Sequence, residues 1–129
     1  MDAIIIEDEA LSAERLLHLV QKVDGAINVK GILGSVESSK EWFRDNSPPD
    51  LIFLDIQLGD GTAFDFLSEV DIVSSIIFTT AYDEYAIRAF KYNSIDYLLK
   101  PIEKNALNSG VDQKKNEHIK KNTERNEFR

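Results

Sequence analysis

The sequence predicts a doubly wound α/β fold, in which a five-stranded parallel sheet carries five helices on its two faces. Two observations predict it: five short apolar runs of strand type alternate with five segments of helical periodicity, and turn residues separate the two kinds of segment. The chain has 129 residues, of which 43% are hydrophobic and 29% are charged. At this length we expect one hydrophobic core and therefore one domain.

Five apolar runs are the expected strands. Each is short, and most are rich in β-branched or aromatic residues, as expected of strands that are buried on both faces of a parallel sheet. The runs cover residues 3–6, 29–33, 51–54, 76–79 and 97–99. We expect the strand order 2-1-3-4-5 with right-handed crossovers, so that the first and third runs are neighbours where the order reverses.

Amphipathic stretches between these runs are the expected helices. Their apolar stripes are Leu11, Leu16, Leu19, Val20 and Val23; Val36, Trp42 and Phe43; Phe64, Leu67 and Val70; Tyr85, Ala86, Ala89 and Phe90; and Leu107 with Val111. We expect Glu9 at the start of the first helix, as a capping or surface acid, because negative charge is favourable there. Trp42 and Phe43 are expected to anchor the second helix in the core. His18 and His118 have no partner that suggests metal binding or catalysis, and we expect both to be structural or exposed to solvent.

The end of the chain differs in composition from the rest. From about residue 114 onward it is polar and repeats Lys, Asn and Glu. We therefore expect a domain over residues 1–115, and over residues 116–129 either a C-terminal helix extension or a disordered tail or linker.

Charge and composition exclude several classes of function. The formal net charge is −8, and the chain has no cysteine, so disulfides, thiol nucleophiles and thiolate metal sites are excluded. Residues 1–102 carry 8 basic against 18 acidic side chains, which disfavours direct nucleic-acid binding and favours a cation site. We find no signal peptide and no apolar run long enough to cross a membrane, and we expect the chain in the cytoplasm.

The residues that follow the expected strands are the candidates for function. Glu7 and Asp8 follow the first run, Asp55 follows the third, and Thr80 and Lys100 stand at the ends of the fourth and fifth. In an open α/β sheet, ligands bind beyond the carboxyl ends of the strands, near the point where the strand order reverses. The acidic run by itself is more typical of a solvated loop, but four separate strand ends each supply a related group, and we therefore expect these five side chains in one crevice.

A divalent cation is the natural partner of such carboxylates, because several negative charges close together repel each other. An all-oxygen site at the rim of a pocket suits Mg²⁺ better than a softer metal. The expected ligands are Glu7, Asp8, Asp55 and the main-chain carbonyl of Gln57.

The remaining groups predict phosphoryl transfer. A carboxylate nucleophile can take a phosphoryl group to form an acyl phosphate if the charge on the transferring oxygens is neutralised. Asp55 is the expected nucleophile because it is the central carboxylate. Thr80 would offer its hydroxyl, and Lys100 its ammonium, to the phosphoryl oxygens. We expect a cis peptide between Lys100 and Pro101, which would turn the ammonium back into the pocket.

At these motifs the chain resembles the receiver domain of two-component response regulators. The matching stretches are residues 4–9 (IIIEDE), 50–56 (DLIFLDI), 78–81 (FTTA) and 96–101 (DYLLKP). Their order and spacing also match over roughly residues 1–115. The stretch 81–90 (AYDEYAIRAF) is similar to the branch whose receivers precede a LytTR-type DNA-binding domain. Such a domain is absent from this sequence, so we expect an excised fragment in preference to a free-standing receiver.

The resemblance implies a flavodoxin-like fold and a function in signalling. Asp55 would accept a phosphoryl group from a phosphohistidine on a sensor histidine kinase, in a Mg²⁺-dependent reaction that the receiver itself catalyses. The family commonly has Asp where Glu7 stands, which puts the metal affinity in question. Gln57 and Tyr82 would flank the phosphoryl group and influence how readily water attacks it.

The resemblance also implies a route from phosphorylation to output. Thr80 would bind the phosphoryl group and draw its loop inward, and Tyr97 would rotate from solvent into the space that the loop leaves. The surface of the fourth helix, fifth strand and fifth helix would then change shape. Four aromatic residues crowd the segment next to this surface: Tyr82, Tyr85, Phe90 and Tyr92. We expect some of them in the core and the others on a face that supports a phosphorylation-linked homodimer. Regulation of transcription would follow through the missing DNA-binding domain.

Two other functions use the same residues. One is a Mg²⁺-dependent aspartyl-phosphate phosphohydrolase, which would need an acid at position 57, where Gln57 stands. The other is a non-phosphorylated interaction module that keeps only the fold.

Overall fold

The computed structural model of the chain describes the backbone of residues 1–127 and the side chains of residues 1–117. Five parallel strands form one sheet in the order β2-β1-β3-β6-β7, which confirms the predicted fold class and strand order. These strands are β1 (Asp2–Ile6), β2 (Asn28–Leu33), β3 (Leu51–Leu54), β6 (Ser75–Thr80) and β7 (Ser94–Leu99). A small antiparallel pair, β4 (Gln57–Leu58) and β5 (Gly61–Thr62), lies outside this sheet and was not predicted.

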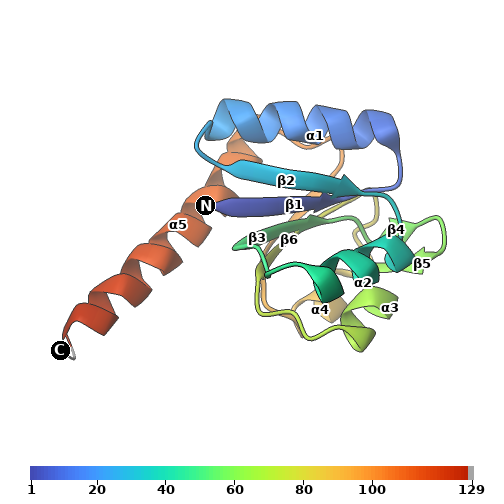
Figure 1. Cartoon of the computed structure of the whole chain (residues 1–129). Coiled ribbons are helices and arrows are strands. Elements are labelled where there is room, and N and C mark those ends of the chain that lie inside the picture. The colour runs from blue at the N-terminus through green and yellow to red at the C-terminus, as the bar shows by residue number, and fades with distance from the viewer. Residues whose placement is uncertain (128–129) are drawn as a thin grey trace.

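Five helices cover the two faces of the sheet (Figure 1). They are α1 (Ala10–Val23), α2 (Val36–Asp45), α3 (Ala63–Glu69), α4 (Ala86–Ala89) and α5 (Lys104–Glu127). Buried side chains of α1 and α5 pack on one face of the sheet, and those of α2, α3 and α4 pack on the other. The helices and sheet form the three layers that alternating strands and crossover helices produce.

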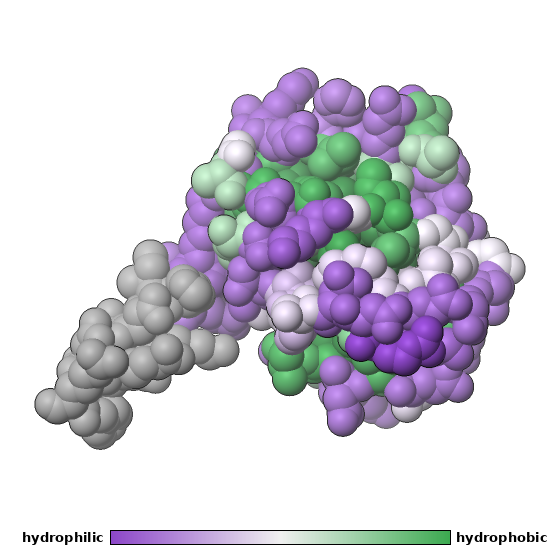
Figure 2. Space-filling view, in the orientation of Figure 1, coloured by the Kyte–Doolittle hydropathy of each residue, from purple (hydrophilic) through white to green (hydrophobic). Residues whose placement is uncertain are grey.

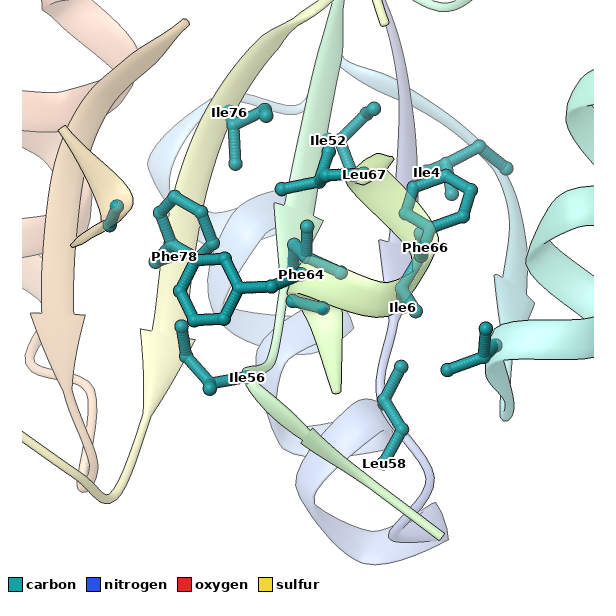
Figure 3. Packing of buried hydrophobic residues seen from close by; sticks show 14 residues of the cluster. Ile4, Ile6, Ile52, Ile56, Leu58, Phe64, Phe66, Leu67, Ile76 and Phe78 are labelled. Atoms are coloured by element: carbon teal, nitrogen blue, oxygen red, sulfur yellow. The ribbon is translucent and has the colours of Figure 1, made fainter. Parts of the chain in front are cut away.

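The core is densest around the three central strands β1, β3 and β6. Every residue of β3 and β6 is buried. The β3 sequence is wholly apolar, as is typical of a strand covered on both faces, whereas β6 has an apolar centre between Ser75 and the pair Thr79 and Thr80. In Figure 3 the rings of Phe64 on α3 and Phe78 on β6 lie side by side, with ring centroids 6.2 Å apart. Burial of each such side chain stabilises the fold by roughly 1.5–3 kcal/mol, which holds the ends of the central strands in fixed positions.

Strand β2 contradicts the expectation that all five strands are buried on both faces. Its residues alternate between exposed and half-buried, and Ile32 remains 44% exposed. The reason is its position at the edge of the sheet; β7, at the other edge, contradicts the expectation in the same way, with Leu99 47% exposed. Figure 2 shows an apolar area, crossed by hydrophilic side chains, in the region of α1 and β2. Lys30, in the middle of β2, opposes pairing with another edge strand.

The fourth helix is shorter than its apolar stripe predicts. Only residues 86–89 form α4, and Phe90, which we expected on the buried stripe, is 72% exposed. Tyr85 stands at the N-cap position and makes no capping hydrogen bond with its side chain. Without a cap the first backbone N–H groups gain no side-chain acceptor, which favours a short helix.

The first helix begins where the sequence predicts, but with two differences. Glu9 occupies the N-cap position without a side-chain capping hydrogen bond and is exposed, so of the two expected roles it has the surface one and not the capping one. Leu11 is 53% exposed, because it lies off the face that Ala13, Leu16 and Val20 bury. Trp42 and Phe43 of α2 are half-buried and pack against the core. His18 is exposed, as expected, with Glu14 one helical turn away.

The fifth helix continues far beyond the sheet. It runs to Glu127 and leaves the body of the domain in Figure 1. Residues 116–127 are thus helical, one of the two outcomes expected for the C-terminal segment, while residues 128–129 and the side chain of His118 lie outside the described part. No helix in the described part of the chain has the length and hydropathy needed to cross a bilayer.

Candidate phosphoacceptor site

The register of the central strands brings the predicted residues to one edge of the sheet. Ile6 of β1 pairs with Leu54 of β3, so the residues that follow them, Glu7 and Asp55, leave neighbouring strands at the same level. The Asp55 backbone N–H donates to the Ile6 carbonyl at 3.0 Å. On the other side of β3, the Lys100 N–H donates to the Thr80 carbonyl at 2.8 Å. Four strands therefore converge on this edge.

Three carboxylates meet there. One carboxylate oxygen from each of Glu7, Asp8 and Asp55 lies within 4.8 Å of the other two. Glu7 and Asp55 are buried, with 4% and 5% of their surface exposed, whereas Asp8 is exposed. The cluster thus has two acids inside the protein and one at its rim.

Lys100 lies between the two buried acids. Its Nζ donates to Glu7 Oε1 at 2.9 Å and to Asp55 Oδ2 at 2.9 Å. Burial opposes the charge on Lys100, but the hydrogen bonds with the two carboxylates outweigh it and raise the pKa of Lys100. The ammonium therefore stays charged near neutral pH. The Lys100–Pro101 peptide is cis, as expected.

Of the charged groups in the site, Glu7 is the one whose ionised form is most disfavoured by its surroundings. Burial and the neighbouring Asp55 carboxylate together raise the pKa of Glu7 to about 8, because the contacts with Lys100, which lower it, do not offset them. A buried carboxyl in this position holds its proton near neutral pH unless another cation arrives.

Two carboxylate oxygens are available to such a cation. Glu7 Oε2 and Asp55 Oδ1 are buried and have no hydrogen-bond partner among the described residues. Buried acceptors without partners are rare in folded proteins. Oxygen ligands from carboxylates, with an exposed rim for waters, are the donor set that Mg²⁺ prefers. The residues present therefore fit this metal.

The side chains of Thr80 and Tyr97 both bind the backbone of Tyr82, a contact that the sequence did not predict. Thr80 is fully buried, and its Oγ1 accepts from the Tyr82 backbone N–H at 3.4 Å. The Tyr97 hydroxyl donates to the Tyr82 carbonyl. Its ring packs on Phe78 at 5.9 Å between centroids, and burial raises the pKa of Tyr97. In this structure Tyr97 is half-buried against the core.

Two further side-chain contacts involve the segment that follows Asp55, and sequence reasoning missed them. Gln57 Nε2 donates to the Tyr85 hydroxyl at 2.9 Å. Asp60 accepts from the N–H groups of Val36 and Glu37, at 2.8 and 3.1 Å, and these bonds lower the pKa of Asp60. It caps α2 from the loop after β4. The only sequence signal was the turn at residues 59–61, which does not name a partner.

Comparisons with known proteins agree with this geometry. The family described as the response regulator receiver domain matches residues 3–112. The sensory transduction protein LytT of Enterococcus faecalis is 34% identical over 116 residues, which cover 88% of this chain and 47% of that protein. LytR of Staphylococcus epidermidis is 36% identical over 116 residues, or 88% of this chain and 45% of LytR.

A solved structure shares the fold. The response regulatory domain of protein mrkE from Klebsiella pneumoniae superposes with a TM-score of 0.80 at 26% identity, covering 90% of this chain and 96% of that domain. The chain spans less than half the length of the two curated relatives above. On these matches the chain belongs to the receiver domain family of two-component response regulators, with relatives of the LytT and LytR type.

Proposed function

We propose that Asp55 is a phosphoacceptor. It takes a phosphoryl group from a phosphohistidine on a sensor histidine kinase: an Asp55 carboxylate oxygen attacks phosphorus, the phosphorus–nitrogen bond breaks, and the histidine leaves. The observation that carries this proposal is the surroundings of Asp55, whose Oδ2 is 2.9 Å from the Lys100 ammonium while Oδ1 has no partner among the described residues.

Mg²⁺ is the proposed cofactor. Glu7, Asp8 and Asp55 would hold it, with the main-chain carbonyl of Gln57. When bound, the metal neutralises negative charge on the transferring phosphoryl oxygens. Lys100 neutralises charge from the opposite side, where its two hydrogen bonds already orient it. The cation also relieves the repulsion between two buried carboxylates, which the chain alone offsets with one ammonium.

Thr80 and Tyr97 form the proposed switch. Phosphorylation adds a group with nearly two negative charges and strong acceptor oxygens, and the Thr80 hydroxyl is the donor that would turn to it. The Thr80 and Tyr97 side chains both bind the backbone of Tyr82. A shift of Thr80 would therefore move the loop that holds the Tyr97 hydroxyl, and the surface of α4, β7 and α5 would change with it.

The partners follow from that surface and from the relatives. Ile87, Phe90 and Leu99 are exposed apolar side chains on α4, at its end and on β7, and they support a phosphorylation-linked homodimer. A DNA-binding output domain, joined after α5, is proposed because the LytT and LytR relatives are about twice as long as the matched region. We propose a cytoplasmic location and a role in transcription on the same basis.

The test is labelling with a small phosphodonor. The chain is incubated with acetyl phosphate and Mg²⁺, and intact mass is compared with that of Asp55→Asn. We expect one acid-labile phosphoryl group per chain, lost completely in Asp55→Asn and retained in the control Asp71→Asn, which changes an exposed acid on the loop after α3.

Other outcomes identify the alternatives. Release of many phosphates per chain would favour a phosphohydrolase that uses the same aspartyl phosphate. No labelling in the unmodified chain would favour an interaction module that keeps only the fold.

A further inference from the structure

The turn between β4 and β5 is tied to the start of α2 by one side chain. Gly59 and Asp60 form this turn. Asp60 Oδ1 accepts from the Val36 N–H at 2.8 Å, and Asp60 Oδ2 accepts from the Glu37 N–H at 3.1 Å. Among the described residues, no other side-chain hydrogen bond joins this turn to another element. Asp60 therefore fixes the turn to the first N–H groups of α2.

The same turn lies against an acid of the proposed cation site. A methyl group on Gly59 would lie 3.6 Å from Asp8 Oδ2, which is ordinary van der Waals contact. Asp8 is exposed, and its carboxylate forms no hydrogen bond or ion pair within the part of the chain that the structure describes. Because no polar partner fixes this carboxylate, its position depends on the backbone that packs against it.

These contacts belong to a closed ring at this side of the site. The Glu7 N–H donates to the Leu33 carbonyl at 2.9 Å, so the end of β1 is joined to the end of β2. Three residues after Leu33 the helix α2 begins, and Asp60 accepts from its first N–H groups. Figure 1 shows the β4–β5 hairpin beside this end of α2. Gly59 then leads back to Asp8, the chain neighbour of Glu7. Asp60 supplies the side-chain hydrogen bonds that close the ring.

Capping of α2 does not by itself account for Asp60. The helix has its own N-cap residue, Ser35, whose Oγ accepts from the Ser38 N–H at 2.9 Å, and these two residues form a complete capping box. Asp60 thus adds to a helix start that is already capped. Its distinct effect is on the hairpin, because β4 and β5 pair only with each other, over two residues each. So short a ladder is too weak to hold its turn in place alone.

We propose that Asp60 is a positioning residue for the cation: by fixing the turn against Asp8, it holds this carboxylate and the hairpin that contains Gln57 in the arrangement that binds Mg²⁺. The inference rests on the proposed Mg²⁺ site and adds a residue that does not contact the metal. Asp60 is not itself one of the ligands, because both of its oxygens are directed at N–H groups of α2. Residues that orient metal ligands commonly raise metal affinity by roughly 10- to 100-fold.

The experiment measures Mg²⁺ binding by the unphosphorylated chain, with isothermal titration calorimetry. Asp60→Ala removes both acceptor oxygens, and Asp60→Asn keeps one. We expect the dissociation constant for Mg²⁺ to rise about tenfold in Asp60→Ala and by a smaller factor in Asp60→Asn. The Mg²⁺ concentration that gives half-maximal labelling by acetyl phosphate should rise by the same factors. If Asp60→Ala does not fold, Asp60→Asn decides the test.

Two control variants separate positioning from capping and from charge. Ser35→Ala removes the side-chain cap of the same helix and leaves the hydrogen bonds of Asp60 in place. Glu37→Gln removes one negative charge from the first turn of α2 and keeps the N–H that Asp60 accepts. Both controls should bind Mg²⁺ as tightly as the unmodified chain, although Ser35→Ala should unfold at a lower urea concentration in the presence of a chelator.

Three results would overturn the inference. Equal Mg²⁺ affinity in the unmodified chain and both Asp60 variants would reject the positioning role and leave the phosphoacceptor function standing. An equal loss of affinity in Ser35→Ala or Glu37→Gln would assign the effect to helix capping or to charge. Absence of Mg²⁺ binding to the unmodified chain would reject the positioning role together with the metal site. Mg²⁺ binding without labelling of Asp55 would instead reject the phosphoacceptor function alone.

Discussion

Two lysines at opposite ends of the sheet are both largely withdrawn from solvent, and their surroundings differ. Lys100, beyond the carboxyl end of β7, lies between Glu7 and Asp55. Lys114 of α5 is 8% exposed, and its Nζ donates at 2.8 Å to the hydroxyl of Ser75, the first residue of β6. One lysine therefore lies at the carboxyl edge of the sheet and the other at its amino edge.

The two edges differ in whether their buried polar groups have hydrogen-bond or ion-pair partners. At the carboxyl edge two buried carboxylate oxygens have no partner among the described residues. At the amino edge polar groups are paired: the Ser74 hydroxyl donates to the Pro49 carbonyl at 2.6 Å, and Lys115 forms an ion pair with Asp24 at 2.5 Å. Pairing fixes α5 against the sheet and the α1–β2 turn. Buried acceptors without a partner instead destabilise the fold, and a ligand that binds them removes this free-energy cost.

Among the substitutions that test this difference between the two edges, Lys100→Met is expected to have the largest effect, a lower rate of labelling by acetyl phosphate. It removes the ammonium that would neutralise phosphoryl oxygens under the proposed function, and loss of one such charged donor lowers a rate by about 100-fold. The measurement is the initial rate of labelling by acetyl phosphate at saturating Mg²⁺. Lys114→Met is the matched control, because it makes the same substitution at the other edge. A rate reduced equally by both substitutions would contradict the assignment of Lys100 to the reaction.

Glu7→Gln should make the free energy of unfolding depend less on pH, because it removes a titrating carboxyl group at the carboxyl edge of the sheet. Because the pKa of Glu7 is raised from 4.5 to about 8 by burial and by Asp55, the folded chain binds more protons than the unfolded chain between these values. The free energy of unfolding of the metal-free chain should therefore fall as pH rises through this window.

Urea unfolding in the presence of a chelator measures this dependence. Glu7→Gln should flatten the slope, while Lys114→Met should keep it. Added Mg²⁺ should also reduce it, because a bound cation favours the ionised carboxylate. A slope that persists in Glu7→Gln would assign the proton uptake to another group.

Lys114→Met is expected to have the smallest effect, and only on stability. It keeps much of the buried stem but removes the charged hydrogen bond to Ser75, which should lower the free energy of unfolding by about 1.5 kcal/mol. Urea unfolding at one pH measures this loss. Phosphorylation by acetyl phosphate should proceed at the unmodified rate, so that a slower reaction would indicate coupling between the two edges of the sheet.

The framework of the site was predictable because it depends on local signals and on one topological rule. Apolar runs marked the strands, and the rule that parallel strands end at a common edge brought Glu7, Asp8, Asp55, Thr80 and Lys100 together. The geometry of these five residues agrees with that prediction in its main feature, the proximity of Lys100 to both buried acids.

The side-chain contacts between distant residues around the site were not predictable in the same way. Gln57 and Tyr85 are 28 residues apart, and Asp60 lies 24 residues from Val36, whose N–H it accepts. Neither pair has a periodicity or a spacing that identifies it. The length of α4 was also missed, because an apolar stripe cannot tell a helix of several turns from a single turn followed by an exposed Phe90.

The sequence by itself determined the order of the elements, the acids at the strand ends and the cis-proline candidate, because each follows from the chemistry of neighbouring residues. Only the tertiary structure decided how far the edge strands are exposed, which carboxylate oxygens lack a partner and which side chains join the loops that follow β3 and β6. The physical reason is that burial and hydrogen bonding between distant residues depend on how whole elements pack. The sequence shows which chemical groups are present, and the packing of the elements determines which of them contact each other.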